Sequence, residues 1–142
     1  MDDLWRLSAK DLAALIRSKK VSAKEAAVSA LSRLDAVNPK INAVVDHRPE
    51  DVLKQATAVD AAIARGEDAG ALSGVPVTVK ANIDQEGFAT TNGLKLQRGA
   101  IATSNSPVAA RQLLATLVCP IRLQPQARAA PASNSHARVN GR

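Results

Sequence analysis

Residues 72–82 read Leu-Ser-Gly-Val-Pro-Val-Thr-Val-Lys-Ala-Asn, and the rest of the chain is organised around this stretch. A run of β-branched residues that follows a glycine is typical of a short buried strand. Gly74 and Pro76 mark its beginning, and Lys80 stands at its far end, before a polar loop. Because ligands bind at the carboxyl ends of strands in open α/β sheets, Lys80 is the candidate catalytic residue. The alternative, which is the commoner case, is a lysine that leaves the strand and extends into solvent.

A strand and a helix are predicted before this stretch, so that the strand that ends at Lys80 is the second strand of the region. Residues 41–45 are expected to form the first short strand, and Pro49 suits the first turn of the helix that follows. Arg65 and Gly66 close that helix. Two strands that a helix of this length joins predict a βαβ unit with parallel strands and a right-handed crossover. The apolar face of the helix would consist of Val52, Ala56, Val59 and Ile63.

Two helices with a short connection are expected at the start of the chain. Ser8 with Asp11, and Ser22 with Glu25, have the spacing of a helix N-cap and an acid at the third helical position. The pair Asn38-Pro39 is expected to end the second helix at about residue 37. The inward faces would consist of Leu12, Leu15 and Ile16 in the first helix, and of Ala27, Ala30, Leu31 and Leu34 in the second.

After the central strand, one turn and one further helix are expected. Thr-Thr-Asn-Gly at 90–93 predicts a turn, and Ser106 caps a helix whose first residue is a proline. From about residue 117 onward, Pro, Ala, Arg and Ser are scattered without an apolar period. Such a segment buries too little surface to offset the entropy of ordering it. We expect 1–116 to form a partial domain and 117–142 to be a disordered tail, or a tail translated out of frame.

Composition and charge narrow the classes of function. All 13 acidic residues lie within 1–86, whereas residues 113–142 carry four arginines and no acid. These arginines are widely spaced and have no aromatic neighbours, which argues against a nucleic-acid site. The single cysteine, Cys119, cannot form an internal disulfide, which fits a cytoplasmic protein. We expect no membrane partner, because no apolar run is long enough to span a bilayer and the N-terminus is acidic.

No metal and no cofactor are expected. His47 has no second ligand at metal-binding spacing, so we interpret it as structural. Cys119 is interpreted as an incidental thiol, because nothing beside it favours the thiolate. The sequence does not indicate an oligomeric state.

Several segments within residues 4–112 occur in an order that is specific as a set, although each segment alone is weak. They are Leu-Ser-Ala-Lys-Asp-Leu-Ala-Ala-Leu-Ile at 7–16, Asn-Pro-Lys-Ile-Asn-Ala-Val at 38–44, Gly-Val-Pro-Val-Thr-Val-Lys at 74–80, Thr-Thr at 90–91 and Ser-Pro-Val at 106–108. As a set they resemble the amidase signature family, the amide hydrolases that include the catalytic subunit of glutamyl-tRNA amidotransferase. The resemblance implies an α/β fold with a mixed sheet covered by helices, of which this chain is the N-terminal part.

The resemblance also implies a Ser–cis-Ser–Lys mechanism on a small-molecule amide. In that family the lysine is the base toward a serine in a cis peptide, which activates the nucleophilic serine. The nucleophile attacks the amide carbonyl, the amine leaves, and water releases the acyl group, while backbone N–H groups stabilise the oxyanion. Lys80 matches the lysine. A base needs a neutral amine, and that form is favoured only where the lysine is removed from water.

Two departures from the family pattern stand out. Ala81 occupies a position where the family commonly has Asp, whereas Asn82 matches. Both serines of the mechanism are missing, because no Gly-Gly-Ser or Gly-Ser-Ser occurs in the 142 residues. We therefore expect a chain truncated before its nucleophile, inactive by itself and with exposed strand edges. Four serines lie outside any such motif and are not candidates for the nucleophile: Ser104, Ser106, Ser133 and Ser135.

Two alternative functions stay open. The chain would act as a non-catalytic fragment if its helix pair bound a full-length amidase. A basic tail at 117–142 would instead bind nucleic acid, with an affinity that falls steeply with salt. We rank the amidase hypothesis first, the binding fragment second and the nucleic-acid binder third.

Overall fold

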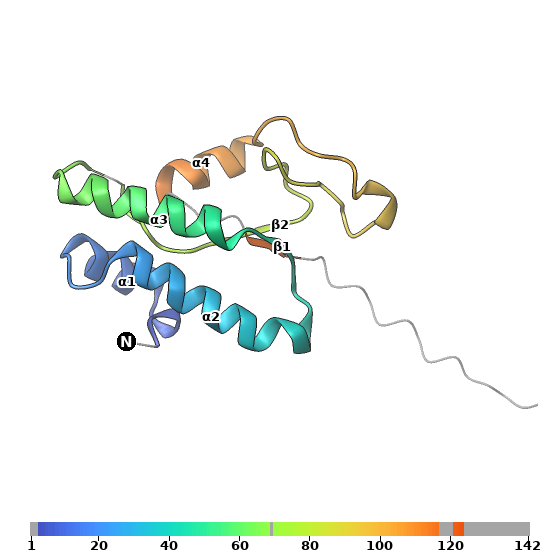
Figure 1. Ribbon diagram of the computed structural model, residues 1–142. Helices are drawn as coiled ribbons and strands as arrows, with labels where there is room; N and C mark the ends of the chain where they lie inside the picture. Colours follow the sequence, from blue (N-terminus) through green and yellow to red (C-terminus); the bar gives the residue numbers. More distant parts are fainter. Residues whose placement is uncertain (1–2, 69, 117–120, 124–142) are drawn as a thin grey trace, which may run out of the picture.

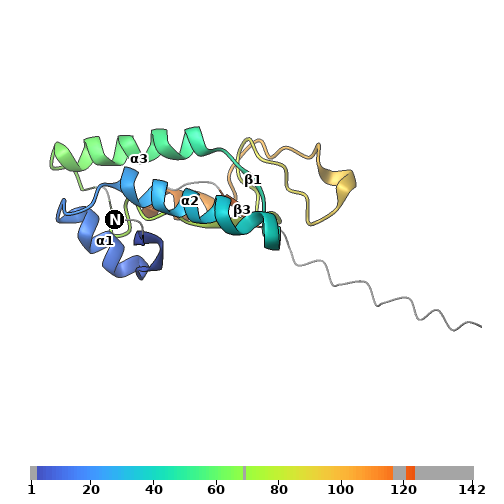
Figure 2. The ribbon, with the colours of Figure 1, turned by 60° about the horizontal axis from the view of Figure 1, so that its bottom comes forward.

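The computed structural model describes residues 3–68, 70–116 and 121–123, and places helices around a small sheet (Figure 1). Helices α2 and α3 pack side by side in both views (Figures 1 and 2). Within the described residues, no helix combines the length and the apolarity needed to cross a bilayer. In chain order the elements are η1 (Leu4–Arg6), α1 (Ala9–Arg17), α2 (Ala23–Ile41), β1 (Val44–His47), α3 (Pro49–Ala64), β2 (Thr78–Lys80), η2 (Lys95–Gln97), α4 (Pro107–Thr116) and β3 (Ile121–Leu123).

Both N-terminal helices begin where the sequence predicted. The Ser8 hydroxyl accepts the Asp11 N–H at 3.1 Å, and the Ser22 hydroxyl accepts the Glu25 N–H at 3.1 Å. The Glu25 carboxylate returns the contact by accepting the Ser22 N–H at 2.8 Å. This backbone hydrogen bond, together with one from the Ser22 side chain, lowers the pKa of Glu25. A serine at the start of each helix therefore accepts one N–H of its own first turn.

Helix α2 ends later than the sequence predicted. It passes through Pro39 and stops at Ile41, and Asn42 then adopts a left-handed conformation with φ of 48°. The proline removes one N–H from the last turn only, so the helix loses little by continuing past it. The Asn38 side-chain amide donates to the Val44 carbonyl, and its oxygen accepts the Val44 N–H, both at 2.9 Å. A neighbouring strand would pair with Val44 in the same way. Strand β1 therefore begins at Val44 rather than at residue 41.

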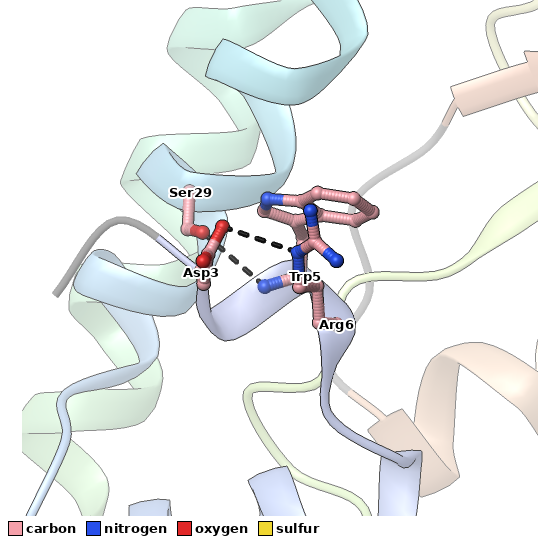
Figure 3. Close-up of polar contacts among 4 residues, drawn as sticks. All are labelled: Asp3, Trp5, Arg6 and Ser29. Atoms are coloured by element: carbon pink, nitrogen blue, oxygen red, sulfur yellow. Dashed lines mark hydrogen bonds and ion pairs between the residues drawn. The ribbon is translucent and has the colours of Figure 1, made fainter.

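The 3-10 helix η1 is held against α2 by a hydrogen bond from the Trp5 backbone to Ser29, drawn in Figure 3. The stacking of Arg33 on the Trp5 ring adds a second contact between the two elements. The Trp5 N–H donates to the Ser29 hydroxyl at 3.3 Å, and the Arg6 guanidinium pairs with Asp3 at 3.3 Å. The guanidinium groups of Arg6 and Arg33 stack on the Trp5 ring, with centroid distances of 4.6 Å and 4.4 Å. One of the two aromatic residues of the chain thus serves as an anchor between elements.

Helix α3 has the predicted start and the predicted inward face. Val52, Ala56 and Val59 are buried and Ile63 is half-buried. The side chain of Asp60 accepts the N–H groups of Ala23 at 2.7 Å and of Lys24 at 3.1 Å. A carboxylate on α3 thereby caps the N-terminus of α2, where the helix dipole favours negative charge. The aliphatic core between these helices includes Leu12, Ala13, Ile16, Ala23, Ala26, Ala27, Leu31, Val52, Ala56, Val59 and Val75.

Within the described residues the sheet is mixed, as expected, but α3 does not join two adjacent parallel strands. Its order is β1-β3-β2, in which β3 is antiparallel to β1 and parallel to β2. The strands on either side of α3 therefore run in opposite directions and are separated by β3, so the predicted parallel crossover is wrong. In the described sheet β1 and β2 do not pair with each other, and each is hydrogen-bonded to β3. The long connection at 65–77 lets the chain enter β2 from either end.

Strand β3 falls within the segment that the sequence analysis assigned to a disordered tail. Its residues 121–123 pair with both neighbouring strands. The rest of 117–142 lies outside the described residues, so the proposed domain boundary and the out-of-frame origin of the tail stay predictions.

The chain enters β2 through a close contact with the first two helices. Gly74 has φ of +80°, and a Cβ at this position would lie 2.7 Å from the Ala23 Cβ and 3.2 Å from the Ile16 Cδ1. Only glycine tolerates both the positive φ and this distance. Beyond it, Val75 and Val79 are buried, so the predicted strand does enter the interior, although its paired part covers only 78–80.

Residues 87–102 form a protruding loop, here called the arm, that extends away from the helices (Figures 1 and 2). The predicted turn at 90–93 lies within it, with positive φ at Asn92 and Gly93. The arm returns the chain to α4, where the Ser106 hydroxyl accepts the Ala109 N–H at 3.2 Å. The prediction of Ser106 as a helix cap is thus confirmed.

Candidate active site

Lys80 is the last residue of β2, and its side chain is exposed, whereas Val79 and Ala81 on either side are buried. Its carbonyl accepts the Ile83 N–H at 3.0 Å, so the chain turns directly after the strand. In the part of the chain that the structure describes, no side chain pairs with the Lys80 ammonium. The backbone position matches the sequence prediction, and the catalytic role stays a prediction.

A cleft of about 360 Å³ opens beside the residue that follows Lys80. Ala81 lines it, and Lys80 does not. Its polar groups include one carboxylate, Asp46, and two cations, Lys95 and Arg98, so both signs of charge border one hollow. The sequence analysis did not identify this cleft. Its walls come from β1 with Val45 and Asp46, from Ala81, and from the arm with Ala89, Thr91, Gly93, Leu94, Lys95 and Arg98.

Asp84 fixes the loop between Lys80 and the arm. The Thr90 hydroxyl donates to the Asp84 carboxylate at 2.6 Å, and the Ser106 N–H donates to the Asp84 carbonyl at 2.9 Å. A second contact runs from the Glu86 N–H to the Asn105 side chain at 2.9 Å. The loop after the candidate base is therefore held against the N-terminus of α4. An acid in a polar loop is not distinctive in a sequence, which is why Asp84 was missed.

The two residues after Lys80 have different surroundings. Ala81, which stands where the family commonly has Asp, is buried, and its carbonyl accepts the Asn92 N–H at 3.5 Å. Asn82, which matches the family, is exposed. An aspartate at position 81 would place a carboxylate in a buried site, where it would need hydrogen-bond donors. Alanine needs none, so this position is compatible with the local packing.

The described serines closest in sequence to Lys80 have other surroundings in the structure. Ser106 caps α4, and Ser104 is exposed. Ser73 is buried, and its hydroxyl has no hydrogen-bond partner among the described residues, but it lies before β2, whereas Lys80 ends the strand. Three residues considered in the sequence analysis lie outside the described residues: Cys119, Ser133 and Ser135.

Two further polar side chains bear on the expected chemistry. The Nε2 atom of His47 is 4.0 Å from the Asp35 carboxylate, and the described residues contain no group of three or more potential metal ligands. Gln85, in the loop after Lys80, is buried, and its carbonyl oxygen has no hydrogen-bond partner in the described part of the chain. Buried amide oxygens are nearly always paired, so the Gln85 oxygen is an exception among the described residues.

The chain resembles known amidases in both sequence and fold. The family model described as "Amidase" matches residues 25–119, which include Lys80, the cleft and the arm. An indoleacetamide hydrolase from Bradyrhizobium diazoefficiens is 45% identical over 105 residues, which are 74% of this chain and 20% of that protein. An acylamidase from Rhodococcus erythropolis is 40% identical over 109 residues, which are 77% of this chain and 23% of that protein.

The fold likeness extends to a solved fatty acid amide hydrolase. Its TM-score is 0.78 at 24% identity, over 87% of this chain and 22% of that one. This chain therefore spans about a fifth of the length of the curated relatives it matches. The matched region confirms the resemblance that the ordered segments indicated, and the chain belongs to the amidase family.

Proposed function

We propose that this chain is the N-terminal part of an amide (C–N) hydrolase in which Lys80 is the general base of a Ser–cis-Ser–Lys mechanism. The observation that carries the proposal is the position of Lys80 at the carboxyl end of β2, next to the residue that lines the cleft. That position lies inside the region matched by the amidase family. The substrate class is a small-molecule amide, and the chemistry calls for no metal or cofactor.

The proposed reaction transfers an acyl group from nitrogen to oxygen and then to water. Lys80, in its neutral form, accepts a proton from the relay serine, which accepts one from the nucleophilic serine. The serine oxygen bonds to the amide carbonyl carbon, the C–N bond breaks, and the amine leaves with a returned proton. Water then attacks the acyl ester, and the acid leaves while the serine regains its proton.

The 142 residues by themselves are expected to be inactive, for two reasons. They contain no glycine-serine motif of the kind that carries the two serines of the family. The Lys80 side chain is also exposed to solvent, whereas catalytic sites exclude water from the reacting groups. Additional parts of the amidase fold would have to supply the serines and exclude water from Lys80.

A chimaera tests the role of Lys80. This chain would replace the matching segment of the B. diazoefficiens indoleacetamide hydrolase, and hydrolysis of indoleacetamide would be measured. We expect Lys80→Ala to lower kcat by about 100-fold or more, because general bases contribute on this scale. Lys80→Arg should be as inactive, because arginine keeps its charge and cannot accept a proton. Lys54→Ala, which removes an exposed lysine on α3, is the matched control and should leave kcat unchanged.

Two results would overturn the proposal. One is an active Lys80→Arg chimaera, which would mean that only the positive charge matters. The other is turnover of a simple aryl amide by the purified 142-residue chain that disappears on Lys80→Ala, since a chain without the two serines should not catalyse the reaction.

A further inference from the structure

We propose that the arm, residues 87–102, is a docking element whose partner is the part of the amidase fold outside the matched region, presenting an apolar socket with acidic groups at its rim. The proposal rests on the family assignment and does not require the catalytic role of Lys80. It assigns the interaction to the arm, whereas the sequence analysis assigned it to the helix pair.

The arm is built in advance of any contact. Three backbone hydrogen bonds of 2.9 Å join its two sides, from Gly87 to Ala102, from Ala102 to Phe88 and from Thr90 to Ala100. These bonds flank an antiparallel bridge between Ala89 and Ile101. A segment with its own hydrogen bonds loses little conformational entropy when it binds, so the arm is preorganised for docking.

Arg48, just before α3, fixes the base of the arm. Its guanidinium donates to the Gly87 carbonyl at 2.7 Å and stacks over the Phe88 ring at 3.9 Å from the centroid. Phe88 itself is buried. Near the tip, the Asn92 side chain donates to the Gln97 side chain at 3.1 Å. The arm is thus braced at both ends, and its direction relative to the helices is set.

The arm exposes large apolar side chains, two of them toward its tip and one, Ile101, near its base. Leu96 is 99% exposed, Leu94 is 55% exposed and Ile101 is 53% exposed. Single exposed apolar residues are ordinary, but three on one preorganised protrusion indicate a surface that is buried on association. The helix pair also exposes apolar side chains, Val28 at 46% and Ile41 at 64%, but neither is as open to water as Leu96.

The extent of the match identifies the partner. The arm lies inside the segment matched by the amidase family, while this chain corresponds to only 22% of the fatty acid amide hydrolase and 26% of another solved neighbour with a TM-score of 0.76. About three quarters of that fold is therefore available to cover the arm.

The charge of the arm argues against a second copy of this chain as the partner. Residues 87–102 contain two cations, Lys95 and Arg98, and no acid. A symmetric contact between two arms would bring like charges together at an apolar centre, which is unfavourable. A socket with acidic groups at its rim complements this pattern.

Co-expression tests the proposal. The 142-residue chain would be produced with the remainder of the B. diazoefficiens indoleacetamide hydrolase, from which the matching segment is deleted, and the complex would be measured by co-elution and titration. We expect a complex whose Kd rises at least about tenfold on Leu96→Asp. Val28→Asp, an equal change on the helix pair, is the control and should leave Kd within about twofold. In the isolated chain Leu96→Asp should not alter the thermal midpoint, because Leu96 already lies in water.

The other outcomes separate the docking role of the arm from its alternatives and from the catalytic role of Lys80. A folded chain that forms no complex, or a remainder that stays insoluble and unbound beside it, would overturn the docking role. A larger effect of Val28→Asp than of Leu96→Asp would move the interface to the helix pair. A homodimer that Leu96→Asp dissociates would replace the partner by a second copy. A complex that depends on Leu96 but has no Lys80-dependent activity would keep the arm and reject the proposed catalytic role.

Discussion

Residues 3–65, here called the helical part, differ from the residues from β2 onward in how they bury apolar side chains and pair polar groups. In the helical part, α1 and α2 are capped by their own first turns and by Asp60 of α3, and the aliphatic faces of the helices pack on one another. From β2 onward, four large apolar side chains are more than half exposed, Leu94, Leu96, Ile101 and Val108, whereas the helical part has one, Ile41. The first part makes most of its contacts internally, and the second is shaped for contacts with something else.

Sheets and helices differ in what they require. A capped helix satisfies its own backbone, whereas an edge strand leaves a row of unpaired N–H and C=O groups. The sheet of the described residues has only three strands, of which β1 and β2 are the edges. It is therefore the part of this chain that most needs further strands, and it is also the part that carries Lys80.

The largest effect is expected where the two parts meet. Gly74→Ala introduces a Cβ 2.7 Å from Ala23 at a positive φ, so it should lower the free energy of unfolding by about 2–4 kcal/mol. Gly66→Ala is the matched control, because Gly66 has φ of +78° and no atom within 4 Å of the added Cβ. It should cost only about 1 kcal/mol, from the backbone alone. Urea unfolding of both variants measures the difference, and equal losses would mean that the chain is not tightly packed where it approaches β2.

A smaller effect is expected for the carboxylate that joins two helices. Asp60→Ala removes the acceptor of two N–H groups at the start of α2, which should cost about 1–2 kcal/mol. Asp60→Asn keeps one acceptor oxygen and should lose about half as much. Thermal unfolding followed by circular dichroism measures both. If the asparagine variant lost as much as the alanine variant, the charge of Asp60 rather than its hydrogen bonds would hold the helices together.

The smallest effect is expected for the change in thermal stability on acidification. Hydrogen bonds from Ser22 lower the pKa of Glu25 in the folded chain below its ordinary value of 4.5. A lowered folded pKa contributes stability that is present above the unfolded pKa and is lost as the pH falls through the folded one. The thermal midpoint should therefore drop on acidification below pH 4.5 in the unmodified chain, and the drop should be smaller in Glu25→Gln. The change is small because Glu25 is exposed to solvent. An identical acid profile for the two proteins would show that this cap does not contribute to stability.

The elements that could be predicted from the sequence are those with local causes. Ser8, Ser22 and Ser106 each bind an N–H three residues away, so serine spacing was enough to locate three helix starts. The end of α2 was misplaced because Asn38 contacts a residue beyond the helix. The family resemblance also came from short stretches of sequence that occur in a fixed order. The family match at residues 25–119 confirms that resemblance.

The features of the candidate site also separate into those with local causes and those that depend on distant parts of the chain. The sequence determined that Lys80 ends a strand, because glycine, proline and β-branched residues specify the backbone conformation within a few positions. Only the tertiary structure decided the strand order with β3 at the centre, the cleft between β1 and the arm, and the exposure of Leu96. These features join residues that are tens of positions apart, so they depend on how elements that are distant in the sequence pack together. Helix caps and turns are settled within one turn of chain, and no distant surface is needed to form them.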